Sequence, residues 1–219
     1  MAARNRTNPL ALALLMCLYE RPMHPYEAAT TLRQRGKHYS VRLNYGSLYA
    51  VVESLERRGL IEAVETQRDG RLPERTVYRL TIAGQIEAQD WLSELVSTPV
   101  KEYPAFEAAL SFLPALTPDQ AGELLEVRAG HLELEIAQAE AIAEMMQKHA
   151  LPRLFRIEGE YSLELKRTEL AFVRKLANEI RTGSLEGSEW WQSVHQDADD
   201  VITYPRDWDR SIGGKEKTQ

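Results

Sequence analysis

The stretch YGSLYAVVESLERRGLIEA, residues 45–63, decides the fold, because it joins a short helix directly to the start of a strand. Asn44, just before it, suits the N-cap position of a helix, and Gly59 suits a C-terminal stop. The apolar residues between them recur at positions i, i+3, i+4 and i+7, which is the spacing of one buried helix face. They are Leu48, Val51, Val52 and Leu55. We therefore expect a packed helix that ends at Gly59 and is followed at once by a strand.

The opposite face of this helix carries small and hydrogen-bonding side chains. Ser47, Ala50 and Ser54 lie on it, and Tyr45 and Tyr49 stand beside them. A helix that enters the DNA major groove needs such an outer face, and its N-terminal amides and nearby hydroxyl groups can bind phosphate. An ordinary surface helix with two half-buried tyrosines shows the same pattern. This helix alone therefore leaves both interpretations open.

Two helices are expected before this stretch. Residues 9–20 are apolar almost all round and follow a suitable cap at Asn8, which predicts a central packing helix. Residues 26–35, YEAATTLRQR, predict a shorter second helix that ends near Gly36. The only cysteine, Cys17, is expected in the first helix as a packed thiol, and a single cysteine fits a reducing cytoplasm.

A β-hairpin is expected after the stretch. IEAVETQ (61–67) and RTVYRL (75–80) are short strand-like runs, and the connection between them contains the turn signal Asp69-Gly70. Three arginines crowd this connection: Arg68, Arg71 and Arg75. Three helices followed by a hairpin with a basic tip form the plan of a winged helix-turn-helix. In that plan the third helix reads the major groove, and the hairpin touches the DNA backbone or the minor groove.

Three segments resemble the PadR family of bacterial transcription regulators. They are MHPYEAATTLRQ, YGSLYAVVESLERRGLI and RTVYRLTIAGQ, in the expected order over about residues 8–90. The sequence departs from the common pattern at Ala50, where a proline is usual, and at Val77, where an aromatic or basic residue is common. The resemblance implies a homodimeric regulator that binds double-stranded DNA, is usually a repressor and is often released by a small-molecule effector.

The resemblance and the sequence together nominate DNA-binding residues. By position, the resemblance implies contacts from Tyr26, Ser47, Tyr49, Arg68, Arg71 and Arg75. The sequence itself adds Lys37, His38 and Tyr45. Arg57 and Arg58 fall in the last turn of the third helix, where positive charge complements the helix dipole. We therefore expect a structural role for these two arginines rather than a DNA contact.

The segment after the hairpin, residues 81–96, predicts a fourth helix. Its apolar stripe is expected to pack on the domain or across a dimer, and consists of Ile86, Leu92, Leu95 and Val96. Trp91 on the same helix has two interpretations. It is a core or interface residue, or it lines an effector pocket, as an aromatic residue does near the end of this helix in some short PadR-like regulators.

The second half of the chain predicts long helices. Residues 103–113 suit a short helix, and the capping box TPDQ at 117–120 starts a helix that runs to about residue 149. The apolar residues of that helix repeat at alternating spacings of four and three, as in a coiled coil. A second long helix is expected from about Pro152 to Arg181. Two antiparallel helices cannot enclose a core alone, so we expect a second chain to cover them. The residues assigned to dimerisation are Leu125, Leu132, Ile136, Met146, Phe172 and Leu176.

The predicted fold class is therefore mostly α. An N-terminal winged helix-turn-helix (three helices plus β-hairpin wing) is followed by an all-helical dimerisation domain with long antiparallel helices, similar to the larger, Vir-type PadR-like proteins. The expected domains are residues 1–98, 99–183 and 184–219. The last is an acidic extension beyond the usual family domain, and its aromatic residues could pack back on the dimer, close a pocket or recruit a partner. They are Trp190, Trp191, Tyr204 and Trp208.

The charge is unevenly divided along the chain. The net charge is −6, but residues 1–80 carry 13 Lys+Arg and 8 Asp+Glu (+5), whereas residues 81–219 carry 14 and 25 (−11). The basic part coincides with the predicted winged helix, so only this part is expected to meet a polyanion. No run is long and apolar enough to cross a bilayer, so no membrane partner is expected.

No sequence motif indicates an enzyme. Phosphate-binding loops, the dinucleotide fingerprint and the nucleophile elbow are all missing, so we expect no catalytic residues and no cofactor. His131 and Glu135, four residues apart, could offer two metal ligands, but a solvated pair is the simpler interpretation and no metal site is expected. A winged-helix module that binds another protein instead of DNA is the alternative function.

Overall fold

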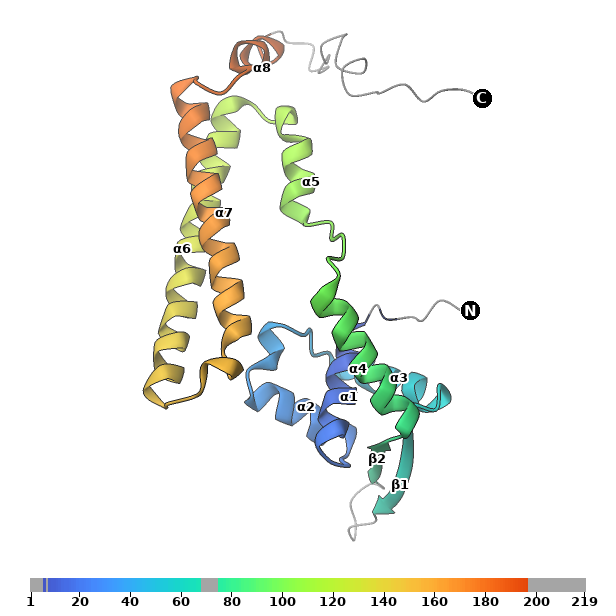
Figure 1. Cartoon of the computed structure of the whole chain (residues 1–219). Helices are drawn as coiled ribbons and strands as arrows, with labels where there is room; N and C mark the ends of the chain where they lie inside the picture. Colours follow the sequence, from blue (N-terminus) through green and yellow to red (C-terminus); the bar gives the residue numbers. More distant parts are fainter. Residues whose placement is uncertain (1–5, 7, 68–74, 197–219) are drawn as a thin grey trace, which may run out of the picture. The chain divides into compact units, whose positions relative to one another are not determined.

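The computed structural model describes residues 6, 8–67 and 75–196. The chain divides between Glu102 and Tyr103 into two compact units, called unit 1 and unit 2 below. Within the described residues, helices dominate and one two-stranded antiparallel sheet accompanies them. The predicted mostly α fold with a hairpin wing is therefore confirmed (Figure 1).

The described residues of unit 1 form four α-helices, one 3-10 helix and the hairpin. The helices are α1 (Pro9–Glu20), α2 (Pro25–Gln34), η1 (Lys37–Tyr39), α3 (Tyr45–Arg57) and α4 (Ile82–Ser97), and the strands are β1 (Ile61–Gln67) and β2 (Arg75–Leu80). Side-chain caps explain several of these boundaries, because Asn8, Asn44 and Thr81 each accept a hydrogen bond from a first-turn amide. Helix α2 begins one residue earlier than expected, since the ring of His24 caps it and Pro25 suits its first turn.

The core of unit 1 forms around α1, which is buried on most sides as its apolar composition predicts. The predicted α3 stripe joins this core through four buried side chains: Leu48, Val51, Val52 and Leu55. Helix α4 packs on it through Ala88 and Trp91. Of the two expectations for the α4 stripe, packing on the domain is wrong, because Ile86, Leu92, Leu95 and Val96 are all exposed, and packing across a dimer stays a prediction.

The wing is fixed at its base by contacts from two directions. β1 and β2 pair from Ile61–Leu80 outward, with a bulge between Ala63 and Glu65. Tyr78 of β2 also exchanges two backbone hydrogen bonds of 3.1 Å with Met23, which lies between α1 and α2. The link between the first two helices therefore forms a single β-bridge with the hairpin, and this bridge helps to orient the hairpin relative to the helices.

Gly84 allows α4 to start directly against the end of α3. A Cβ atom at Gly84 would lie 2.0 Å from the carbonyl oxygen of Leu60, which is far inside contact distance. Thr81 strengthens the same junction, because its hydroxyl donates to the carbonyl of Gly59 at 2.7 Å. The segments on the two sides of the wing are thus held together by close backbone packing.

Unit 2 is built from two long helices and shorter ones beside them. They are α5 (Ala105–Ser111), η2 (Leu113–Ala115), α6 (Pro118–Lys148), η3 (Arg153–Phe155), α7 (Ile157–Thr182) and α8 (Ser188–Val194). The predicted capping box at Thr117 and Gln120 is present in both directions, and α7 ends at Gly183 with φ +69°. Helices α6 and α7 lie side by side and run in opposite directions (Figure 1).

The seam between α6 and α7 forms the core of unit 2. Leu125, Ala129 and Leu132 of α6 are buried together with Val173, Ala177 and Ile180 of α7. The predicted heptad positions therefore meet a helix of the same chain.

Helix α8 also belongs to this core. The indole N–H of Trp191 donates to the carbonyl of Leu116 at 2.7 Å, and Trp190 packs beside it. Three roles were considered for the aromatic residues of the extension: packing back, closing a pocket or recruiting a partner. Trp190 and Trp191 pack back on their own unit. Tyr204 and Trp208 lie outside the described residues.

Candidate nucleic-acid interface

Helix α3 presents its small and hydrogen-bonding face outward. Its apolar stripe is buried, while Tyr49 is 54% exposed and Ala50 is also exposed. The hydroxyl of Ser47 donates to the carbonyl of Asn44 at 3.0 Å, so its oxygen keeps lone pairs for an outside donor. Asn44 itself accepts from the amide of Gly46 at 2.9 Å. The N-terminal half of α3 is therefore both rigidly capped and open to a ligand.

Tyr26 lies at the start of α2, with its side chain 57% exposed. Its amide donates to Nδ1 of His24 at 3.1 Å, which fixes the first turn of the helix. The hydroxyl of Thr30 donates to the carbonyl of Tyr26 at 2.9 Å and ties the next turn to it. Tyr26 is thus an exposed aromatic residue on a well-anchored helix start.

The connection between α2 and α3 carries basic and aromatic side chains. Lys37 and His38 lie on η1, and the His38 ring is tilted by 35° against the Tyr39 ring at a centroid distance of 4.2 Å. Tyr39 is strongly exposed, and Arg42 is exposed close by in the chain. Neither Tyr39 nor Arg42 was among the predicted contacts. The mixture of basic and aromatic residues in KHYSVR, residues 37–42, could have indicated them.

Several predicted DNA contacts fall where side chains are not described. Arg68 and Arg71 lie outside the described residues. Arg75 is the first residue of β2 and Tyr45 the first of α3, but only their backbone is described. On the described part of the hairpin, Arg79 forms a 2.6 Å ion pair with Glu62 across the two strands.

Arg58, at the C-cap of α3, makes a specific ion pair. Its Nη2 donates to Oε1 of Glu87 on α4 at 3.1 Å. The structural role expected for Arg58 is therefore observed, although its partner is a carboxylate and not only the helix dipole. Arg6 binds the same carboxylate, which raises the pKa of Arg6 above its ordinary value.

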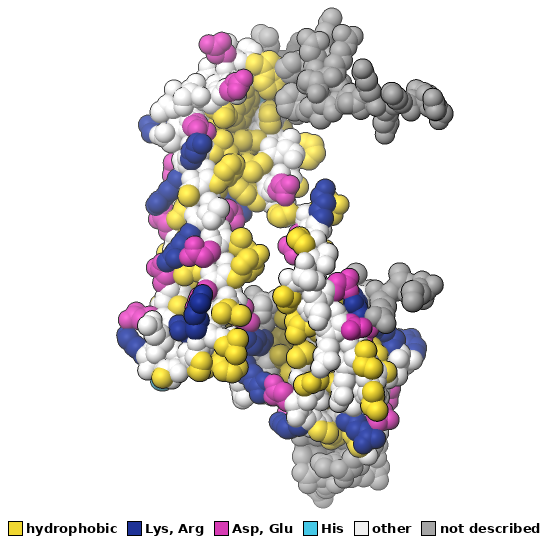
Figure 2. All heavy atoms as spheres, viewed as in Figure 1, with side chains coloured by type: hydrophobic (Ala, Val, Ile, Leu, Met, Phe, Trp, Pro, Cys, Tyr) yellow, Lys and Arg dark blue, Asp and Glu magenta, His cyan; other side chains and the backbone are white. Residues whose placement is uncertain are grey.

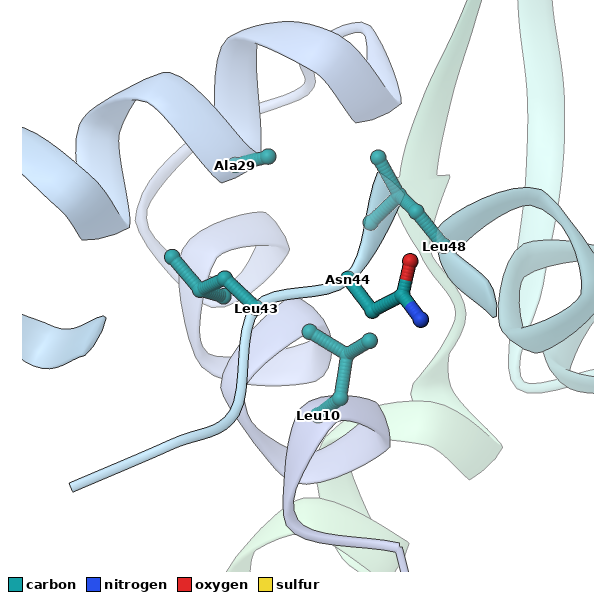
Figure 3. A pocket seen from close by; sticks show the side chains of 5 residues that line it. All are labelled: Leu10, Ala29, Leu43, Asn44 and Leu48. Carbon is teal, nitrogen blue, oxygen red and sulfur yellow. The ribbon is translucent and has the colours of Figure 1, made fainter. Parts of the chain in front are cut away.

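Trp91 lies in the core of unit 1 and is only 1% exposed. Its indole N–H is buried and has no hydrogen-bond partner within the described residues. A shallow apolar hollow elsewhere in the unit lies between α1, α2 and the start of α3, lined by Leu10, Ala29, Leu43, Asn44 and Leu48 (Figure 3). It leaves no room even for a water molecule, so it reflects packing and is not a binding site.

Cys17 is buried in α1, and burial raises the pKa of its thiol to about 11. A thiol with that pKa stays protonated and unreactive at neutral pH. Over the residues that the structure describes, no three metal-binding side chains come together. None of the described helices has the length and apolar composition needed to cross a bilayer.

The residues assigned to dimerisation occupy two different environments. Leu125 and Leu132 are buried in the seam between α6 and α7 of the same chain, and Ile136, Met146 and Leu176 are partly buried. Phe172 is half exposed on the outside of α7. With Tyr161 and Leu165, at positions i, i+4 and i+11, it forms an exposed apolar row that we call the α7 stripe. Figure 2 shows apolar side chains gathered along this helix.

The helices, the hairpin and the outward face of α3 define a winged helix-turn-helix protein. Residues 14–90 match the model of the Transcriptional regulator PadR-like family, so the chain carries a PadR-like domain and the predicted resemblance is confirmed there. No curated protein sequence matches the chain significantly.

Solved structures support the same fold. Bacillus subtilis PadR in complex with operator DNA is 18% identical, with a TM-score of 0.64 over 79% of this chain and 99% of that one. Bacillus subtilis PadR in complex with p-coumaric acid is 16% identical, with a TM-score of 0.64 over 78% and 98%. The Vibrio cholerae virulence activator AphA is 15% identical, with a TM-score of 0.61 over 79% and 98%. The similarity extends beyond the PadR-like domain, so the likeness of fold includes much of unit 2.

Proposed function

We propose that this protein is a sequence-specific DNA-binding transcriptional regulator of the bacterial cytoplasm. It acts as a homodimeric repressor on a pseudo-palindromic operator and is released by a small-molecule effector. The observation that carries this proposal is the outward face of α3, where Ser47 and exposed Tyr49 stand on a capped helix start that leads directly into the wing. Such a face suits a major groove, and the match of residues 14–90 to a family of transcriptional regulators supports it.

The exposure of several predicted contact residues supports the following arrangement on DNA. Tyr49 and Ser47 approach base edges or phosphates in the groove, and Tyr26 reaches the backbone from the start of α2. Lys37 and His38, with Tyr39 and Arg42 near them in the chain, extend the DNA-binding surface along the DNA backbone. Arg68, Arg71 and Arg75, in or next to the connection between β1 and β2 in the sequence, add further contacts to phosphates.

A dimer supports this function because two α3 helices related by a two-fold axis can enter successive major grooves about 34 Å apart. The exposed α7 stripe supports dimerisation, since exposed aromatic and aliphatic rows on a long helix are unfavourable in water. Leu125 and Leu132 then hold α6 against α7 within each chain, and the second chain packs on Phe172 and its neighbours.

An effector is supported by the similar fold of a PadR structure that contains p-coumaric acid. Trp91 is the predicted contact, and its buried, unpartnered indole N–H would donate to an acceptor atom of such a ligand. Because Trp91 is almost fully buried, a ligand that reached it would have to displace α4.

The test is a titration of labelled DNA from the region upstream of the gene, read by fluorescence anisotropy at several salt concentrations. Each phosphate contact lowers the log–log slope of affinity against salt by about 0.9, so a regulator with several contacts shows a steep loss with salt. We expect tight, saturable, strongly salt-dependent binding that an excess of unrelated DNA does not abolish. Weak binding that is the same for all sequences would contradict the proposal and favour the protein-binding alternative.

A further inference from the structure

Glu87 is the one buried carboxylate among the described residues. It joins α4 to the end of α3, through Arg58, and to the segment before α1, through Arg6. It lies on α4 with its side chain only 8% exposed. Oε1 accepts from Nη2 of Arg58 at 3.1 Å and from Nε of Arg6 at 3.3 Å, and Oε2 accepts from Nη2 of Arg6 at 3.0 Å. A carboxylate this buried is stable only when such partners satisfy it, so the three side chains hold each other in place.

Because Arg58 lies at the C-terminal end of α3, its ion pair with Glu87 also restrains the orientation of this helix. Arg58 is the C-cap of α3, and the amides of Arg58, Gly59 and Leu60 close the last helical turn onto Ser54, Glu56 and Leu55. Tyr49 lies nine residues earlier on the same helix, which is about 14 Å at the usual rise per residue. An ion pair at one end of a short rigid helix therefore constrains the direction in which its other end points.

We propose that Glu87 is a positioning residue for DNA binding: through Arg58 it fixes the end of α3 on α4, and so sets the orientation in which Ser47 and Tyr49 face the groove. This inference rests on the proposed function. It also gives Arg58, whose side chain is 32% exposed, a carboxylate partner within the unit in place of a phosphate contact. Arg6 completes the site by neutralising the second oxygen of Glu87 and by pairing with Glu94, about two turns further along α4.

The chain offers a matched control for this pair. Arg35 is the C-cap of α2 and pairs with Glu20 on α1, at 2.5 and 2.8 Å. The chemistry and the position at a helix end are the same, but both side chains are about half exposed. Exposed ion pairs contribute little, so loss of this pair should leave α2 in place.

The experiment measures operator affinity and its salt dependence for Glu87→Gln, Arg58→Met and the double variant, with Glu20→Gln as control. We expect each single variant to bind about tenfold more weakly, and the double variant to bind no more weakly than the singles, because they remove the same constraint. The slope of affinity against salt should stay at the wild-type value, since no phosphate contact is lost. Glu20→Gln should bind like the wild type.

Two results would overturn the proposal. If Arg58→Met lowers the salt slope by about one while Glu87→Gln binds like the wild type, Arg58 is itself a phosphate contact. If all variants bind like the wild type, the pair does not position α3.

Hydrogen exchange separates failure of this inference from failure of the proposed function. In Glu87→Gln the amides of Arg58, Gly59 and Leu60 should exchange faster, whereas Glu20→Gln should leave them unchanged. A wild-type protein that binds no DNA would refute the proposed function, and unchanged exchange in Glu87→Gln would independently refute the role of Glu87 at the end of α3.

Discussion

Unit 1 and unit 2 bury their apolar side chains in different ways. In unit 1 the other helices pack around α1, the described outer face of α3 carries small residues and Tyr49, and exposed apolar side chains lie on α4. In unit 2 the two long helices meet along one seam, and the α7 stripe stays exposed, with Tyr161 68% exposed and Phe172 50% exposed. The comparison indicates that the outer face of α3 in unit 1 is suited to a polar partner, whereas the α7 stripe of unit 2 is suited to another apolar surface.

The largest effect is expected from substitutions in the α7 stripe, which should weaken the dimer. In the variant Leu165→Glu/Phe172→Glu, two carboxylates would enter an apolar interface, which should weaken the dimer by about a thousandfold, or about 4 kcal/mol. Sedimentation velocity over a range of concentrations measures this. Leu134→Glu is the control, because Leu134 is similarly exposed but lies on the side of α6 away from the seam. A dimer that survives in the first variant, or dissociates equally in the control, would show that another surface joins the chains.

The wing arginines provide the next largest effect. Changing Arg68, Arg71 and Arg75 together to Gln should lower operator affinity about a hundredfold and reduce the salt slope by about three, because three phosphate contacts are removed. The measurement is DNA binding at several salt concentrations. A control with the same change of charge in unit 2 replaces Arg153, Arg167 and Arg174, each of which pairs with a surface glutamate. Equal losses in both triple variants would mean that only net charge matters.

Replacing one helical glycine in each unit by alanine tests how closely each glycine is packed. Gly84→Ala should destabilise unit 1 by about 2 kcal/mol, because the new methyl group would collide with the carbonyl oxygen of Leu60. Gly130→Ala on α6 should be neutral or stabilising by up to about 1 kcal/mol, because no atom lies within 4 Å of the added Cβ and alanine favours a helix. Denaturant unfolding of both variants tests this. A stable Gly84→Ala protein would contradict the close junction of α4 with the wing.

Tyr49→Phe removes one hydroxyl from the outward face of α3. We expect operator affinity to fall about fivefold, or about 1 kcal/mol, because one hydrogen bond to DNA is lost. The thermal midpoint should not change, since this side chain is exposed. Tyr103→Phe, at an exposed tyrosine of unit 2 outside the α7 stripe, is the matched control and should leave DNA binding unaltered. Unchanged affinity in Tyr49→Phe would remove Tyr49 from the interface.

Cys17 gives the smallest effect and reports on the core of unit 1. Burial raises its thiol pKa from 9.0 to about 11, so the folded state favours the protonated form. The stability that this preference contributes is complete below about pH 9 and is lost as the pH rises toward 11. At neutral pH a thiol reagent should label Cys17 only after denaturant unfolds unit 1. Rapid labelling of the native protein would contradict the packing of α1.

Local signals in the sequence predicted most element boundaries. Asn44, Gly59 and the box at Thr117 mark helix ends through their own backbone chemistry, so α3 and α6 begin or end where expected. Long-range contacts were not predictable in this way. The bridge between Met23 and Tyr78 and the cluster at Glu87 join residues far apart in the sequence, and no local pattern marks them.

The same limit applies to the packing partners of single helices. Periodicity showed that α4 has apolar residues but not which face is inward, because Ala88 and buried Glu87 replace larger apolar groups there. The heptad on α6 predicted a seam, but could not tell a partner helix of the same chain from one of a second chain. For the candidate site, the sequence supplied Tyr26, Ser47 and Tyr49 on exposed or half-exposed positions, and it gave no sign of the pairing of Arg58 with Glu87.

The most direct test of the central claim is a footprint of the purified protein on the DNA upstream of its gene, at low and at near-physiological salt. We expect a protected region with two-fold symmetry, whose two halves lie about one helical turn, or about 34 Å, apart and whose affinity falls steeply with salt. Protection of a single half-site would contradict the dimer. No protected site there or in a genome-wide search, at any salt concentration, would contradict the claim that α3 and the wing bind DNA.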